Sequence, residues 1–88
     1  MNIREKLQQE HPDAELLFMT EEEFDEAIIR VASHKDPHTK KMVKAVAYDR
    51  DKVILVNESM GMTYDEAVEY FDFNQEGAYM GENTPIFV

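Results

Sequence analysis

The 88-residue chain contains no cysteine, which excludes disulfide bonds, zinc–thiolate and iron–sulfur sites, and a thiol nucleophile. It contains no apolar run near the ~20 residues that a transmembrane helix requires. Its first ten residues also lack the hydrophobic stretch of a secretory signal. We therefore expect a cytoplasmic protein without membrane contact.

Catalytic and nucleotide-binding signatures are missing as well. The sequence has no P-loop, GxGxxG, GxSxG or HExxH motif, and neither Ser33 nor Ser59 has a visible histidine–acid pairing. Residues 34–38 bring two histidines close to a carboxylate, but the neighbouring lysines repel cations, so no metal site is expected there. We expect a protein that is not an enzyme and that binds no cofactor or metal.

Basic residues are few. Nine Lys and Arg face 19 Asp and Glu, which gives a formal net charge of -10. A protein that binds the phosphate backbone needs a Lys/Arg surface to release counterions, so direct binding to nucleic acid is not expected. The charges are also segregated, because residues 7–29 and 53–88 contain no Lys or Arg, whereas Lys35, Lys40, Lys41 and Lys44 all lie within residues 34–44. This basic loop is expected either to fold against the chain's own carboxylates or to contact another molecule.

The apolar content is that of a folded chain. Hydrophobic residues make up 43% of the sequence, with five Phe and four Tyr, which is enough to form a core that a disordered acidic tail lacks. The length leaves room for one core, and no linker, repeat or low-complexity tract divides the chain. The expected organisation is a single domain over residues 1–88.

The first half of the chain predicts a helix followed by a hairpin. Apolar spacing predicts a peripheral N-terminal helix over residues 2–10, which Pro12 prevents from continuing. Thr20 to Glu23 has the form of a capping box, so a short helix is expected to begin there and to turn into a strand at residues 27–34. A turn at residues 35–38 and a second strand-like run at residues 42–48 then predict an antiparallel hairpin with a basic tip.

The segment after the hairpin is ambiguous. Val53 to Val56 alone resembles a strand. Asp49 or Asp51 can cap a helix, however, and Gly61 can end one. We therefore predict a helix over residues 50–60.

The last third begins with a second capping box at Thr63 to Glu66. An apolar stripe at helical spacing follows, formed by Tyr64, Ala67, Val68 and Phe71. This helix is expected to run to Gly77 or Tyr79, and residues 85–88 are expected to form a terminal strand whose proline suits a strand start or a sheet edge. The predicted fold class is α+β, a small antiparallel sheet of the hairpin plus the C-terminal strand, packed with helices.

Four carboxylates recur on one face of that last helix, at the spacing i, i+4, i+7 and i+11: Asp65, Glu69, Asp72 and Glu76. No Lys or Arg at i+4 relieves their repulsion, and the face is either simply solvated or used to bind a basic partner. The row spans about 16.5 Å at 1.5 Å per residue, over which duplex DNA presents roughly ten charges. Four carboxylates are therefore too few for a DNA mimic unless the acidic block at residues 21–26 joins them.

Aromatic residues accompany these acids. Most of Tyr64, Tyr70, Phe71, Phe73 and Tyr79 are expected in the core, with Tyr70 and Phe73 pointing partly outward. If those two are exposed beside the carboxylates, the surface has the aromatic anchors of a protein interface. If they are buried, they serve the scaffold only.

The ending of the chain resembles a known sequence pattern. Residues 61–74 (GMTYDEAVEYFDFN) and 77–87 (GAYMGENTPIF), preceded by Tyr48 to Ile54 and by Asp25 to Ile29, resemble a family of small uncharacterised proteins of tailed bacteriophages and prophage regions. The resemblance covers about 60 residues and implies a phage or prophage origin, and hence a bacterial host cytoplasm. It implies no activity and transfers no catalytic or ligand residue. The chain departs from the pattern in its longer basic insertion at residues 34–44 and at Leu55 and Asn57.

A second candidate site lies in the turn that this ending contains. Its members combine glycines, which allow close backbone approach, with side chains that donate and accept hydrogen bonds: Asn74, Gly77, Gly81, Glu82, Asn83 and Thr84. The alternative is that Asn74 and the glycines only shape the end of the helix and the turn.

These observations favour a small acidic phage-type accessory protein that binds a host or phage protein through the carboxylates of residues 65–76. The alternatives are a small-ligand or metal-binding domain, an enzymatic role included, centred on residues 74–84, and a component of a phage particle. Self-association into a homo-oligomer also stays open.

Overall fold

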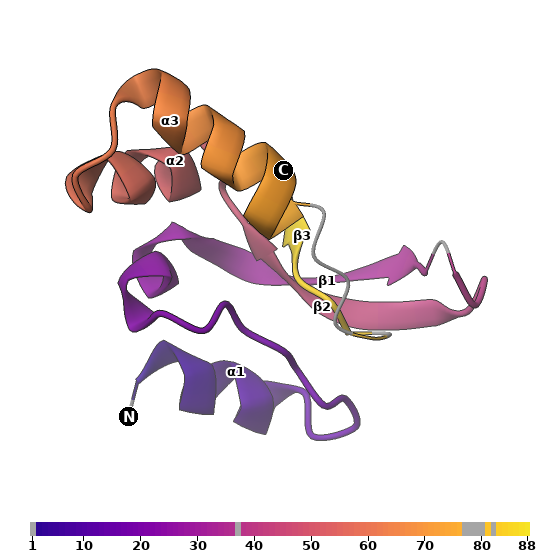
Figure 1. Cartoon of the computed structure of the whole chain (residues 1–88). Helices are drawn as coiled ribbons and strands as arrows, with labels where there is room; N and C mark the ends of the chain where they lie inside the picture. The colour runs from indigo at the N-terminus through magenta and orange to yellow at the C-terminus, as the bar shows by residue number, and fades with distance from the viewer. Residues whose placement is uncertain (1, 37, 77–80, 82) are drawn as a thin grey trace.

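The computed structural model describes residues 2–36, 38–76, 81 and 83–88. Within these residues the chain forms an α+β fold, as predicted, with a three-stranded sheet in the order β1-β2-β3. Helices α2 and α3 lie above the sheet in Figure 1, and α1 lies below it. The elements in chain order are α1 (Ile3–Glu10), the 3₁₀ helix η1 (Glu22–Ala27), β1 (Ile28–Lys35), β2 (Met42–Tyr48), α2 (Arg50–Ser59), α3 (Tyr64–Tyr70), the π-helical segment η2 (Phe71–Glu76) and β3 (Ile86–Phe87).

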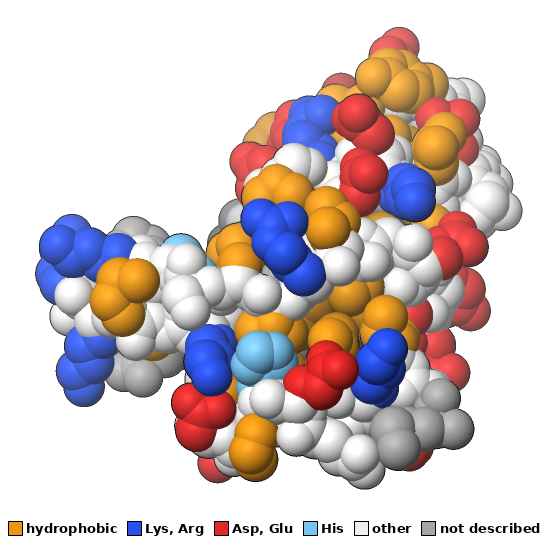
Figure 2. Space-filling model, turned by 180° about the vertical axis from the view of Figure 1, so that it is seen from behind, with side chains coloured by type: hydrophobic (Ala, Val, Ile, Leu, Met, Phe, Trp, Pro, Cys, Tyr) orange, Lys and Arg blue, Asp and Glu red, His pale blue; other side chains and the backbone are white. Residues whose placement is uncertain are grey.

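The predicted hairpin is confirmed. Strands β1 and β2 pair antiparallel, with Val31 opposite Val46, and a register shift lies near Arg30. Their far end extends beyond the helices (Figure 1), and basic side chains, drawn in blue, lie at this end beside hydrophobic and other side chains (Figure 2). The radius of gyration is 13.2 Å, above the ~12 Å of a compact chain of this length, because the hairpin projects from the rest of the molecule.

The C-terminal strand corrects one part of the predicted sheet. Strand β3 pairs with β2 in parallel, with Ile86 beside Ala47 and Phe87 beside Tyr48, so the sheet is mixed and only its hairpin is antiparallel. A parallel neighbour requires a crossover connection, and here α2 and α3 supply it. Pro85 lies directly before this edge strand, where its missing N–H costs no ladder bond.

The helices of the crossover begin at the predicted caps. The Asp49 side chain accepts a hydrogen bond from the Lys52 N–H at 3.2 Å and caps α2. Thr63 and Glu66 form the capping box of α3, since each side chain accepts from the other residue's backbone N–H. The helical turns continue as α3 and then η2 to Glu76, and the predicted helix end at Gly77 or Tyr79 lies outside the described residues.

The capping box predicted at Thr20 is wrong. The segment forms a 3₁₀ helix that begins at Glu22, with Glu21 at the N-cap position and no side-chain cap bond. Only six residues separate that cap from the extended backbone of β1, and burial of Phe24 and Ala27 places the segment against the core. Packing, rather than a capping side chain, determines where this turn lies.

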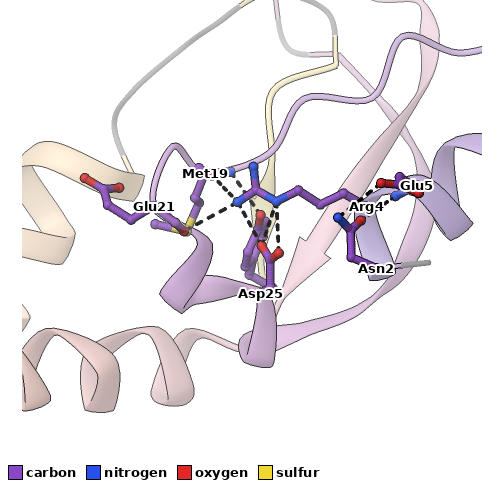
Figure 3. A network of polar contacts seen from close by, with 7 residues as sticks. Asn2, Arg4, Glu5, Met19, Glu21 and Asp25 are labelled. Carbon is purple, nitrogen blue, oxygen red and sulfur yellow. Dashed lines mark hydrogen bonds and ion pairs between the residues drawn. The ribbon is translucent and has the colours of Figure 1, made fainter.

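Helix α1 is attached to the body through Arg4 (Figure 3). The Arg4 Nε donates to both carboxylate oxygens of Asp25 at 2.9 and 3.0 Å, and its Nη2 donates to the carbonyl of Met19 at 2.7 Å. The bond to Asp25 raises the pKa of Arg4. Leu7 is the buried residue of this helix, and the Gln8 side chain donates to the Ala14 carbonyl and accepts from the Leu16 N–H. The polar contacts of Arg4 and Gln8 and the burial of Leu7 together hold α1 in place.

The core lies between the sheet and the helices, and its largest member is Tyr48. Its ring is fully buried, and its hydroxyl accepts a hydrogen bond from the Met19 N–H at 2.9 Å. Asn57, also fully buried, donates to the side-chain oxygen of Gln75 at 2.9 Å and accepts from the Gln75 amide at 3.2 Å. This amide pair fixes η2 against α2.

Candidate functional site

The predicted acidic row lies on the outer side of α3 and η2. Ala67 and Phe71 are fully buried against the core, which turns the opposite side of the helix to solvent. All four members of the row, Asp65, Glu69, Asp72 and Glu76, are exposed. The sequence therefore predicted correctly that these carboxylates are at the surface.

The π-helical turn interrupts the regularity of that row. From Phe71 onward the backbone follows wider turns with i→i+5 hydrogen bonds, so later residues are rotated relative to an ideal α-helix. Asp65 and Glu69 keep their α-helical spacing, whereas Asp72 and Glu76 are displaced from it. The four carboxylates thus form a broad acidic surface instead of a straight line.

One cation relieves part of this charge. Arg50, at the start of α2, has its Nη2 4.0 Å from Asp72 Oδ1, and its guanidinium lies over the Phe71 ring at 5.2 Å. Among the described residues, no ion pair is found for Asp65, Glu69 or Glu76. Most of the negative charge on this surface is therefore left for solvent ions or a partner.

Aromatic side chains are exposed beside the acids. Phe73 is 82% exposed and Tyr70 39%, as the sequence suggested for these two. Tyr64 is 62% exposed, which corrects its expected place in the apolar stripe: at the first turn of α3 it lies beyond the edge of the core. Of the five aromatics considered, Phe71 is buried, and Tyr79 lies outside the described residues.

The exposed aromatics and acids share a shallow hollow on α3 and η2. We call this surface the acidic aromatic face. Its hollow is lined by Met62, Glu66, Glu69, Tyr70, Phe73 and Asn74, and the exposed carboxylates Asp65, Asp72 and Glu76 of the same helical segment belong to it. Hydrogen bonding from the Thr63 backbone N–H lowers the pKa of Glu66, so this carboxylate stays charged in mildly acidic solution. An apolar ring set among carboxylates is the arrangement of an interface, with an anchor inside a polar rim.

The basic loop is divided between two environments. Lys44 contacts the body, with its Nζ 3.0 Å from Asp13 Oδ1, and this bond lowers the pKa of Asp13. At the tip, the Asp36 side chain accepts from the N–H and hydroxyl of Thr39. Lys35 and Lys40 are exposed, and they lie at the end of β1 and in the loop between β1 and β2.

The described residues of the predicted turn site do not gather around one pocket. Asn74 lies at the acidic aromatic face, whereas Asn83 donates to the Lys44 carbonyl at 2.7 Å. The Thr84 hydroxyl donates to the Gly81 carbonyl at 2.6 Å, and Gly81 has a φ of 118° that only glycine adopts easily. These bonds shape the turn itself, and the remaining members, Gly77 and Glu82, lie outside the described residues.

Neither a metal site nor a membrane-spanning helix is found in the part of the chain that the structure describes. No group of three His, Asp or Glu side chains there could hold a metal ion. No helix there is long and apolar enough to cross a bilayer.

Comparison with known proteins adds no relationship to this geometry. No family model matches the chain, and neither a curated protein nor a solved structure matches it significantly.

Proposed function

We propose that this chain is a protein-binding module whose docking surface is the acidic aromatic face. The observation that carries the proposal is the position of Phe73, which is 82% exposed on a folded helix. Of the carboxylates on that helix, Asp65, Glu69 and Glu76 have no ion-pair partner among the described residues. Burial of a Phe side chain contributes about 1.5–3 kcal/mol, and this contribution is recovered only when another molecule covers the ring.

The charges around the ring indicate the chemistry of the partner. Asp65 and Glu69 have no ion-pair partner among the described residues, so a surface rich in Lys and Arg would be attracted to them. Such attraction acts over a Debye length of about 8 Å at physiological salt and raises the association rate more than the final affinity. The partner that fits is a basic protein with an apolar spot that receives Phe73.

The biological setting of the proposal comes from the sequence. The resemblance of residues 61–74 and 77–87 to a family of tailed phages and prophages favours a non-enzymatic accessory protein that acts on a host or phage protein in the bacterial cytoplasm. A role in a phage particle would instead use the same face for contacts between copies of this chain, and sedimentation of the purified protein distinguishes the two.

The test is affinity capture from bacterial lysate with the tagged chain, read by mass spectrometry at low and at high salt. The face variant replaces Asp65, Glu69, Asp72 and Glu76 by Lys. The matched control makes the same change of net charge elsewhere, on the exposed residues Glu10, Glu15, Glu23 and Glu26. We expect one basic protein to be captured by the wild type and the control at low salt, and to be lost at high salt and with the face variant.

Equal loss with both four-fold variants would show that net charge alone, and not this face, attracts the captured protein. Capture that survives in the face variant would contradict the proposal. Circular dichroism and a thermal melt of each variant confirm that a loss of capture is not a loss of folding.

A further inference from the structure

A second, deeper hollow adjoins the acidic aromatic face. It has a volume of about 210 Å³ and shares Tyr70 and Asn74 with that face. Three segments far apart in the sequence surround it: the loop at residues 19–21, the end of α3 and η2, and residues 85–87. Its lining residues are Met19, Thr20, Glu21, Tyr70, Asn74, Gln75, Pro85 and Phe87.

The size of this pocket limits what it can hold. Sites for drug-sized ligands and cofactors occupy about 300–1,000 Å³, so a nucleotide or similar cofactor is too large for it. A single side chain of a docked protein fits this scale. The pocket shares Tyr70 and Asn74 with the face that carries Phe73, so a partner docked on that face lies beside it.

The walls have two kinds of chemistry. Met19 and Pro85 are buried, and the Phe87 ring makes an edge-on contact with the Phe71 ring, with centroids 5.0 Å apart. These residues give the pocket an apolar floor. The opening is polar, with the Tyr70 ring and the Asn74 amide on the helical side and Thr20 and Glu21 on the loop side.

The pocket is negatively charged. Glu21 is its ionisable carboxylate, and no Lys or Arg is among its described lining residues. Arg4 lies nearby, but its guanidinium is already bound by Asp25 and by the Met19 carbonyl. Figure 3 shows the Glu21 side chain pointing away from Arg4 and toward the end of the helical segment η2.

We propose that this pocket receives an arginine side chain of the basic partner. An arginine has an apolar stem for the floor formed by Met19 and Phe87. Its planar guanidinium can stack on Tyr70 while it pairs with a carboxylate such as Glu21. A lysine lacks the planar group, and a neutral side chain leaves the charge of Glu21 unpaired. This inference rests on the proposed function, since it names the side chain by which that partner is recognised.

The test uses the N-acetylated, C-amidated peptide Gly-Arg-Gly as the probe, titrated into the ¹⁵N-labelled full chain and followed by NMR. We expect saturable shifts at Met19 to Glu21, Tyr70, Asn74 and Phe87. Peptides with lysine or norleucine in place of arginine are expected to bind at least ~3-fold more weakly, because stacking or charge is lost. Glu21→Gln should weaken the arginine peptide by a similar factor, whereas Glu10→Gln, which removes the same charge from α1, should not.

Equal binding of the norleucine peptide, or shifts outside these residues, would overturn the inference. Absence of saturable binding by the arginine peptide would overturn it too, even if capture by the acidic aromatic face succeeded. If instead the peptide binds at the pocket but the four-fold face variant captures as well as the wild type, the pocket chemistry stands and the proposed docking face fails. The two failures are therefore distinguishable.

Discussion

The buried amide pair between α2 and η2 leads to the prediction that replacing both residues destabilises the protein less than replacing one. Asn57 is fully buried, and it exchanges two hydrogen bonds with Gln75 and donates a third to the Ala67 carbonyl at 3.3 Å. Replacing Asn57 alone by Leu, which has a similar shape, removes these bonds and leaves the Gln75 amide facing an apolar group. Each net hydrogen bond contributes about 0.5–1.5 kcal/mol, so we expect Asn57→Leu to lower the free energy of unfolding by about 2 kcal/mol.

Replacing both partners should be milder than replacing one. In the double variant Asn57→Leu, Gln75→Met no polar group of the pair is left unsatisfied, and such exchanges are often nearly neutral. We expect the double variant to lose less than about 1 kcal/mol of unfolding free energy. The coupling free energy between positions 57 and 75 should therefore exceed the ~0.3–0.5 kcal/mol by which independent sites deviate from additivity.

Urea unfolding measures both changes. With a slope near 1 kcal/mol per molar, typical of a small domain, the midpoint of Asn57→Leu should fall by about 2 M and that of the double variant by less than 1 M. Gln75→Met is measured alone as well. If the loss of unfolding free energy in the double variant equals the sum of the losses in the two single variants, the two amides are not coupled and the reasoning is refuted.

Three further predictions concern single side chains. Tyr48→Phe should cost about 1–2 kcal/mol, because the buried Met19 N–H loses its acceptor. Burial raises the pKa of Tyr48, so the wild type should lose stability as the pH rises above about 10, and this alkaline loss should be smaller in Tyr48→Phe during urea unfolding at increasing pH. Arg4→Met should lower the free energy of unfolding by about 1–3 kcal/mol and should accelerate hydrogen exchange in α1 more than in α2. Equal acceleration in the two helices would contradict the role of Arg4 as an anchor. Thr63→Ala should cost about 1 kcal/mol. The lowered pKa of Glu66 contributes stability that is present above about pH 4.3 and is lost as the pH falls further, so thermal melts of Glu66→Gln and the wild type should differ less in acid than at neutral pH.

Elements with strong local signals could be predicted from the sequence. Asp49 and the Thr63 capping box marked the starts of α2 and α3 because a cap depends on neighbours within three residues. The two strands of the hairpin were predicted to within one residue, since β-branched and aromatic residues surround a clear turn. Buried Asn57 did not break α2, because Gln75 satisfies its amide.

Features that depend on distant contacts could not be predicted. The sequence from Thr20 to Glu23 matches a capping box. Burial of Phe24 and the start of β1 at Ile28, however, leave room only for a short 3₁₀ helix. The direction of β3 depends on how the crossover returns to the sheet, which no local pattern encodes. The acidic row was predicted, whereas Thr20 and Glu21 were missed as pocket residues because their neighbours Tyr70 and Asn74 lie about 50 positions away.

The central claim is that Phe73 is the anchor of a docking surface. The most direct test is the dissociation constant of the purified captured partner for Phe73→Ser, beside the matched control Leu55→Ser, which changes another exposed apolar residue, 60% exposed, on α2. Loss of about 1.5–3 kcal/mol of burial predicts affinity at least ~10-fold weaker for Phe73→Ser and less than ~2-fold weaker for Leu55→Ser. Equal affinities of Phe73→Ser and the wild type would contradict the account.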